Sequence, residues 1–210
     1  MSKYTIFYLE VVSLLVLPVI LSAWYPQVFA ARYTLTVIGA IYCAWRLIHS
    51  SATLTDLGIH RSGFKKSLKE LLLPSLFLII ATFLVFYLLP LPLLTAIVGS
   101  DPLPVTSILQ RALVYFFIST PLQELIFRGY LTWRLNEVFD SARVVKFISV
   151  GLFTFAHLPF MSPLILVITL IMGTIYIKTY LKYSNIFALI LSHSVVGTCL
   201  IIIRNAWFPF

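Results

Sequence analysis

The stretch PLQELIFRGY, residues 121–130, places a glutamate and an arginine four positions apart inside a run that is otherwise mostly apolar. An ionisable side chain at the centre of a bilayer costs at least about 2.5–3.5 kcal/mol, and residues of this kind usually mark a functional site. Glu124 and Arg128 therefore predict a buried polar site, provided that the chain around them lies in a membrane.

The composition is that of a membrane protein. Of the 210 residues, 60% are hydrophobic and 10% are charged, and the mean hydropathy is +1.01. Apolar runs of about 20 residues can cross a bilayer. They predict an all-α polytopic transmembrane helical bundle of seven spans, or eight if a re-entrant or further segment is present. The seven runs are residues 4–23, 31–49, 71–89, 107–133, 145–160, 163–181 and 185–203. No internal repeat is visible.

The basic residues predict the orientation and exclude one class of partner. If the N-terminus is inside, twelve of the 15 lysines and arginines fall on the cytoplasmic side and three fall outside, as the positive-inside rule requires. The cytoplasmic set is Lys3, Arg46, Arg61, Lys65, Lys66, Lys69, Arg128, Arg134, Arg143, Lys146, Lys178 and Lys182, and the external set is Arg32, Arg111 and Arg204. The net charge is +8, but these residues are scattered through loops and form no basic stripe, which argues against nucleic-acid binding.

Two further segments bear on the topology. Residues 57–74, LGIHRSGFKKSLKELLLP, are basic, then amphipathic, then apolar. This order predicts an interfacial helix on the cytoplasmic leaflet that leads into the third span, and the alternative is a basic loop that only sets the topology. Near the N-terminus, Lys3 and the apolar run after it resemble a signal peptide, but Glu10 and the length of the run favour a retained first span.

Five ionisable side chains fall well within the expected spans: Glu10, Glu124, Arg128, His157 and His193. Glu10 is isolated on the first span, and a neutral or interface-facing carboxyl explains it. At about 1.5 Å of rise per residue, Glu124 lies about 15 Å, His157 about 18 Å and His193 about 12–13 Å from the cytoplasmic ends of their spans. Three helices thus bring a carboxylate and two imidazoles into one layer about 5 Å thick. This coincidence favours a shared site over separate helix-packing contacts.

The fourth span carries most of the polar residues. Thr120, Glu124 and Arg128 share one face because they are spaced four residues apart. Gln123 lies about 100° round the helix from Glu124 and can line the same cavity. Pro121 is expected to kink the helix and free a carbonyl group, and Arg128 is expected to keep Glu124 ionised.

Three segments, QELIFRG (123–129), FTFAH (153–157) and HSVVG (193–197), resemble in order and separation the motifs of the CPBP intramembrane proteases. This family, also called Abi, groups CAAX prenyl endopeptidases with bacteriocin-processing and immunity-related proteins. Its pattern is Glu-Glu-x-x-x-Arg, then Phe-x-x-x-His, then His-x-x-x-Asn or a small polar variant. The resemblance covers about residues 107–203 and implies a catalytic core there. Residues 1–106 would supply N-terminal spans and the interfacial helix to the same integrated membrane domain.

Carried over residue by residue, Glu124 and Arg128 match the second glutamate and the arginine of the first motif. Phe153 and His157 match the second motif, and His193 matches the histidine of the third. Two positions depart from the pattern. Gln123 replaces the first glutamate, often assigned as the residue that activates water, and Gly197 replaces an asparagine that is thought to help hold the oxyanion.

The resemblance implies an intramembrane endopeptidase that uses a glutamate-activated water. Glu124 would take the proton of the water, and His157 would align that water or protonate the leaving nitrogen. His193 and Gln123 would stabilise the oxyanion, and Arg128 would set the charge of Glu124. We expect no cofactor. A zinc ion held by Glu124, His157 and His193 is the metal-dependent alternative.

Two other classes of protein carry such polar layers. One is a catalytically degenerate membrane protein that acts as a bacteriocin immunity factor or assembly partner. The other is a proton-relaying transporter, which the lack of paired inverted repeats disfavours. The expected partners are the lipid bilayer and a membrane-associated peptide or protein substrate, such as a prenylated tail, a leader peptide or a C-terminal sorting anchor. The expected location is a prokaryotic inner or plasma membrane, with the N-terminus in the cytoplasm.

Overall fold

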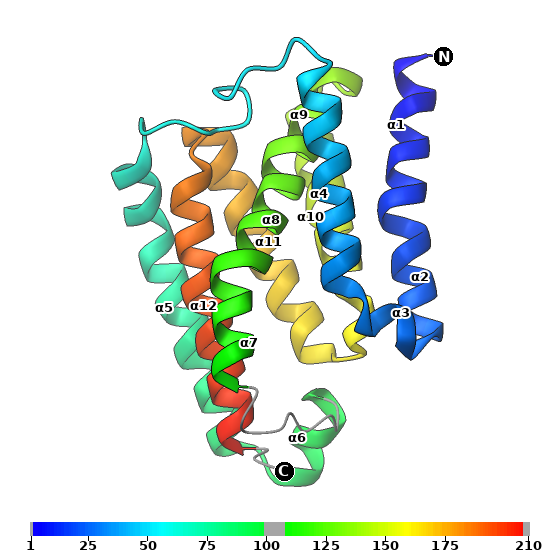
Figure 1. Ribbon diagram of the computed structural model, residues 1–210. Helices are drawn as coiled ribbons and strands as arrows, with labels where there is room; N and C mark the ends of the chain where they lie inside the picture. Colours follow the sequence, from blue (N-terminus) through cyan, green and yellow to red (C-terminus); the bar gives the residue numbers. More distant parts are fainter. Residues whose placement is uncertain (1, 99–107, 208–210) are drawn as a thin grey trace.

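The chain folds into a bundle of helices that run up and down side by side (Figure 1). The computed structural model describes residues 2–98 and 108–207, and within these ranges it contains helices and turns but no strand. The first helix, α1 (Lys3–Val11), begins and the last, α12 (Ile186–Trp207), ends at opposite ends of the bundle (Figure 1). The all-α prediction is confirmed.

The remaining elements follow in chain order. The first half contains η1 (Val12–Val16), α2 (Leu17–Trp24), α3 (Pro26–Ala30), α4 (Arg32–Ile48), α5 (Phe64–Leu88) and α6 (Leu91–Val98). The second half contains α7 (Ile108–Val114), η3 (Tyr115–Ser119), α8 (Thr120–Glu124), η4 (Leu125–Leu131), α9 (Thr132–Val138), α10 (Ala142–Phe155), η5 (Leu158–Phe160) and α11 (Pro163–Tyr183). Of these, η1, η3 and η4 are π-helical and η5 is a 3-10 turn.

Five helices of the described residues are long and apolar enough to cross a membrane. They are Lys3–Trp24, Phe64–Leu88, Ala142–Phe160, Pro163–Tyr183 and Ile186–Trp207, and each corresponds to one predicted span. The other two predicted spans correspond to α4, which has 17 residues, and to the run from α7 to α9, which carries the charged residues of the site. The total of seven or eight spans therefore stays a prediction.

Two π-helical segments are explained by prolines. Pro18 and Pro121 each lie two residues after such a segment, because η1 ends at Val16 and η3 ends at Ser119. A proline inside a helix has no N–H to donate, and its ring collides with the carbonyl group four residues earlier. That carbonyl belongs to a residue of the widened segment in both cases, so the π turn makes room for the ring. The π turn therefore accommodates Pro121 within the helical run that carries Glu124.

The segment predicted as a separate interfacial helix has a different structure. Residues 57–63 form turns, and α5 begins at Phe64 and continues without a break to Leu88. Gly58 adopts a φ of +69°, and a Cβ there would come within 2.6 Å of the Ser184 carbonyl oxygen. The Gly58 carbonyl in turn accepts a hydrogen bond from the Ile186 amide at 3.0 Å. The prediction of a separate helix is wrong, because these turns pack against the α11–α12 connection.

The prediction that Glu10 is isolated is also wrong. Glu10 is only 6% exposed and accepts four hydrogen bonds, all between 2.9 and 3.0 Å. Its donors are Tyr42 and Arg46 on α4, Tyr130 at the end of η4, and Arg134 on α9. We call these five residues the Glu10 cluster. It fastens the first helix to two others through buried, charge-assisted hydrogen bonds.

The sequence contains a signal for this cluster. The donors come from two similar pentapeptides, YCAWR (42–46) and YLTWR (130–134). In each, tyrosine and arginine are four residues apart and so lie on one face of a helix. The two faces enclose the Glu10 carboxylate. These two pentapeptides are thus a short recurrence in a sequence that has no longer internal repeat.

The apolar core consists of separate clusters with polar residues between two of them. One cluster joins α5, α11 and α12 and includes Tyr176 and Leu189. A second joins α1, η4, α9 and α10 and includes Phe127 and Phe153. Arg128 lies between them, since its guanidinium carbon is 4.0 Å from the ring centroid of Phe153 and 5.8 Å from that of Tyr176. The fold thus places a charged group where two apolar clusters meet.

Candidate active site

Three of the residues singled out in the sequence are in direct contact. His193 on α12 and Glu124 at the end of α8 share a hydrogen bond of 2.6 Å between Nδ1 and Oε1. The other carboxylate oxygen of Glu124, Oε2, is 3.4 Å from the Arg128 Nε. Glu124 and Arg128 are 0% exposed and His193 is 3% exposed. The structure therefore joins two of the three recognised motifs in one buried ion-pair network.

Local helix geometry explains how Glu124 reaches this position. Thr120, Glu124 and Arg128 are all 0% exposed, as expected for residues that share the inner face of one helix. The π-helical segments η3 and η4 lie on either side of α8. Such segments occur frequently at functional sites, where they change the direction of the side chains that follow. The irregular helix formed by η3, α8 and η4 thus points its polar face toward the interior of the bundle.

Aromatic rings surround the polar contact. The centroids of Tyr115, Phe153 and Tyr176 lie 6.0, 5.9 and 5.7 Å from that of the His193 ring, each in an edge-to-face arrangement. Tyr176 in turn shares a hydrogen bond of 3.0 Å with the Ser192 hydroxyl. These contacts fix the orientation of the imidazole and exclude bulk water, so the Glu124–His193 hydrogen bond lies in a medium of low dielectric constant.

His157 lies near this network without touching Glu124 directly. Its Nδ1 is 2.8 Å from the Phe153 carbonyl oxygen, and its ring is 4.9 Å from the Phe153 ring. Phe153 thus contacts both histidines, and His157 is close enough to His193 and Arg128 to interact with them electrostatically. His157 falls in the apolar segment Ala142–Phe160, as predicted, but α10 itself ends at Phe155 and His157 lies in the turn that follows. Pro159 explains the end, because it has no N–H to bond the Phe155 carbonyl.

Gln123 makes a different contact from the one expected. Its Nε2 donates a hydrogen bond of 2.8 Å to the Ser119 hydroxyl, one turn earlier on the same helical run. Its Oε1 is buried and has no hydrogen-bond partner among the described residues. The side chain is therefore held along its own helix by one of its two amide N–H groups, while its carbonyl oxygen lacks a partner.

Several buried polar atoms around Glu124 have no hydrogen-bond partner in the described part of the protein. They are Thr120 Oγ1, Gln123 Oε1, Glu124 Oε2, Arg128 Nε and Arg128 Nη1. Buried polar groups in proteins are nearly always satisfied, by water if not by protein. A site with two to four such groups is polar enough to hold an ordered water molecule. Glu124 Oε2 is the one carboxylate oxygen among these atoms.

The arrangement also bears on the metal-dependent alternative. Among residues 2–98 and 108–207, no group of three or more His, Cys, Asp and Glu side chains is arranged to hold a metal ion. Glu124, His157 and His193 are therefore not grouped as a ligand set in the described residues, and His193 Nδ1 is engaged with Glu124. The chemistry below is derived from the side chains alone.

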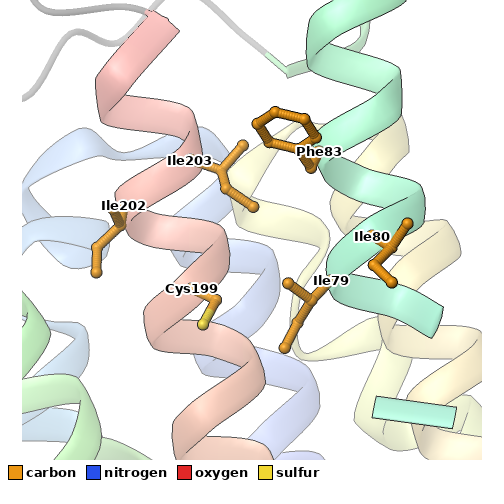
Figure 2. Close-up of a pocket in the computed structure, with 6 residues that line it drawn as sticks. All are labelled: Ile79, Ile80, Phe83, Cys199, Ile202 and Ile203. Carbon is orange, nitrogen blue, oxygen red and sulfur yellow. The ribbon is translucent and has the colours of Figure 1, made fainter. Parts of the chain in front are cut away.

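Two hollows of the surface lie away from this network. Figure 2 shows an apolar groove between α5 and α12, lined by Ile79, Ile80, Phe83, Cys199, Ile202 and Ile203. A second, polar hollow adjoins the Glu10 cluster and includes Arg46, Trp133 and Arg134. Neither hollow includes Glu124 or His193 in its lining. The buried pair thus lies outside both of these hollows.

The sequence analysis did not identify the aromatic residues around His193. Tyr115 and Tyr176 lie in apolar runs and look like ordinary core residues, and only their positions in the fold bring them to the imidazole. One signal was present, because Gly197 interrupts a helix of large apolar residues and leaves room for a neighbour.

Comparison with known proteins gives one match. Residues 104–199 match the family model described as Rce1-like, type II CAAX prenyl endopeptidase Rce1-like. No curated protein and no solved structure is similar enough to count as a match. The matched region contains Glu124, Arg128, His157 and His193. The long apolar helices support an integral membrane protein, and residues 104–199 are similar to a family of membrane proteases.

Proposed function

The chain carries a domain of the Rce1-like family in residues 104–199, and from that premise we propose that it is an intramembrane endopeptidase in which Glu124 activates a water molecule. One observation carries the proposal: the buried Glu124 has one oxygen fixed by His193 while the other lacks a hydrogen-bond partner. A carboxylate held at one oxygen and open at the other is suited to bind a water and accept its proton.

The first step is attack by that water. Glu124 Oε2 accepts a proton from the water, whose oxygen forms a bond to the carbonyl carbon of the scissile peptide. The electron pair of the carbonyl π bond moves to the carbonyl oxygen, which becomes the oxyanion. Glu124 is then neutral and can return the proton to the leaving nitrogen as the C–N bond breaks. The same carboxyl group thus serves as base and then as acid, and the proton count balances.

His193 holds the carboxylate and has one further nitrogen to offer. If the imidazole is protonated, its Nδ1–H is donated to Glu124 Oε1 and its Nε2–H is free for the oxyanion. A short contact of 2.6 Å is typical of a charge-assisted hydrogen bond. The proposed resting state is therefore an imidazolium paired with the Glu124 carboxylate. Arg128 supplies a second positive charge, which keeps Glu124 ionised before water attacks.

His157 and Gln123 have supporting roles in the proposal. His157 is the second imidazole within electrostatic reach of His193, and it would align the water while Glu124 returns the proton to the leaving nitrogen. Gln123 uses one of its two amide N–H groups on Ser119, and its carbonyl oxygen lacks a partner among the described residues. It can therefore orient a water by accepting a hydrogen bond, and its second N–H could donate to the oxyanion.

A substrate-trapping experiment tests this function. Membranes from cells that contain Glu124→Gln instead of the wild-type protein should accumulate an uncut membrane-associated protein, which mass spectrometry of protein termini would identify. A prenylated tail, a leader peptide and a C-terminal sorting anchor are the substrate classes that fit. Purified wild-type protein should cut the identified segment, and chelators should have no effect. Loss of cleavage with a chelator that zinc reverses would instead establish the metal-dependent mechanism.

A second function is favoured by the complete burial of Glu124. Because the pair is sealed by aromatic rings and neither surface hollow reaches it, the network would also suit a membrane protein that binds a partner without cutting it, such as an immunity factor or assembly partner. In that case Glu124→Gln would keep full biological function in cells, because the amide preserves size and most hydrogen bonds.

The proposed orientation places the basic end of the bundle in the cytoplasm of a prokaryotic cell. A reporter fused after residue 62 is then expected in the cytoplasm. Its appearance on the external side would reverse the orientation and the expected side of substrate entry.

A further inference from the structure

Gly197 makes space for a tyrosine hydroxyl. A Cβ built at Gly197 would lie 2.2 Å from the Tyr115 hydroxyl oxygen and 2.4 Å from its Cζ. These distances are far below any real contact of a Cβ atom, so no other residue fits while Tyr115 keeps its position. The Tyr115 hydroxyl therefore occupies the volume that a side chain at position 197 would fill.

Position 197 is one helical turn beyond His193 on α12, so both residues lie on the same face. Tyr115 meets this face from η3, and its ring contacts the edge of the His193 ring at a centroid distance of 6.0 Å. Tyr115 is also close enough to Thr120 and Glu124 to interact with both. The phenol group thus belongs to the surroundings of the Glu124–His193 pair.

The segment that carries Tyr115 is fixed to α12. The hydroxyl of Ser194, which is 0% exposed, donates a hydrogen bond of 2.9 Å to the Phe116 carbonyl oxygen. This bond joins the residue after His193 to the residue after Tyr115. The widened turn of η3, which accommodates Pro121, frees backbone carbonyl groups for such side-chain donors. Tyr115 is therefore held through its backbone, by the Ser194 bond to Phe116, and through its ring, by the contact with His193.

We infer that Tyr115 is a catalytic residue that donates its hydroxyl hydrogen bond to the carbonyl oxygen of the scissile peptide as that oxygen becomes negative. This inference rests on the proposed function. A neutral phenol has one O–H donor, and a preorganised donor in a site without bulk water stabilises an oxyanion far better than water does. No proton is transferred to or from Tyr115: the proton of the water goes to Glu124, and the phenol only strengthens its hydrogen bond as charge develops.

The inference explains why a glycine stands at position 197. With Tyr115 in place, a side chain at 197 would displace the phenol, whereas without Tyr115 the same volume would be empty. Positions 115 and 197 thus form a matched pair in which one residue supplies the polar group and the other supplies the space. His193 Nε2 and the Tyr115 hydroxyl would then be two donors on one side of the scissile bond.

The test uses purified protein in liposomes and an internally quenched peptide with an S-farnesyl cysteine three residues from its C-terminus. Tyr115→Phe keeps the ring and removes only the hydroxyl. It should lower kcat by about 10²–10³-fold, the usual effect of losing one oxyanion donor, while KM stays unchanged because the ground-state carbonyl needs no such donor. Tyr87→Phe, at an exposed site on α5, removes a hydroxyl away from the pair and should leave kcat unchanged.

A double variant tests whether Tyr115 acts as a hydrogen-bond donor or only fills space. Tyr115→Ala should lose activity as Tyr115→Phe does, and adding Gly197→Asn to Tyr115→Ala should restore part of kcat, since the amide then fills the same volume with a new donor. Full activity of Tyr115→Phe, with Glu124→Gln inactive on the same peptide, would overturn the role of Tyr115 and leave the proposed function standing. If the wild-type protein cuts neither this peptide nor the trapped substrate, the proposed function fails, and the inference fails with it.

Discussion

Glu10 and Glu124 are both buried carboxylates in apolar helices, yet their surroundings differ. Glu10 accepts four hydrogen bonds from two tyrosines and two arginines, so both of its oxygens have partners. Glu124 has one hydrogen bond, from His193, and one longer contact to Arg128 at 3.4 Å. In the sequence the two residues look alike, because each is a single glutamate within an apolar run.

The difference distinguishes a structural carboxylate from a reactive one. A buried charge whose hydrogen bonds are all made lies in a deep energy minimum and has no capacity left for a substrate or a proton. A buried charge with an unpartnered oxygen destabilises the fold, and such under-satisfied groups frequently have a catalytic role. We therefore propose a structural role for the Glu10 cluster and a catalytic role for the Glu124 network.

Loss of Arg128 should have the largest effect on stability. Arg128→Leu leaves Glu124 buried without its only arginine, and breaking a buried pair on one side costs about 3–5 kcal/mol. The free energy of unfolding, measured by denaturant titration in detergent micelles, should fall by that amount. The matched change Arg46→Leu should cost much less, because Glu10 keeps Arg134 and Arg46 is 23% exposed. Equal losses in the two variants would remove the distinction between the two networks.

Glu10→Gln should have an intermediate effect. The amide still accepts hydrogen bonds, but two arginines lose a charged partner, and a hydrogen bond to a charged group contributes about 1.5–3 kcal/mol. Arg134 retains Glu137, with which it also pairs, and this limits the loss. Thermal unfolding should therefore shift to lower temperature. An unchanged midpoint would show that the cluster does not fasten the first helix.

Tyr130→Phe should have the smallest effect. Tyr130 is 5% exposed and donates one hydrogen bond of 2.9 Å to a carboxylate that keeps three other donors. A loss of about 0.5–1.5 kcal/mol is expected for one hydrogen bond of this kind. Tyr42→Phe serves as its counterpart on α4. A loss in either variant as large as that of Arg128→Leu would mean that the cluster is as poorly compensated as the Glu124 network.

Much of the site could be predicted from the sequence, because its charges stand out against apolar runs. Glu124, Arg128 and His193 were singled out from their depth and spacing alone, and they are in contact in the structure. The same reasoning treated Glu10 as isolated, since its partners lie 32 to 124 residues away in the chain. Long-range partners leave no periodic signal, and only the recurrence of YCAWR and YLTWR indicated a shared role.

The boundaries of elements were harder to predict. Pro159 ends α10 at Phe155, five residues before the limit of the predicted span, which places His157 in the turn between α10 and η5. The π-helical turns next to Pro18 and Pro121 were also missed, since a proline in an apolar run can be accommodated by a kink or by a widened turn. Gly197 stood out only as a small residue among large apolar ones, and its role could not be predicted because it depends on the position of Tyr115 in space.

The most direct test compares Glu124→Gln with Glu10→Gln in two measurements on the same purified samples: the rate of peptide cleavage per folded molecule and the midpoint of thermal unfolding. Glu124→Gln should remain folded and cut about 10²–10⁴-fold more slowly, the contribution of a positioned general base. Glu10→Gln should unfold at a lower temperature and cut at the wild-type rate while folded. Cleavage by Glu124→Gln at the wild-type rate would contradict the assignment of Glu124 as the residue that activates water.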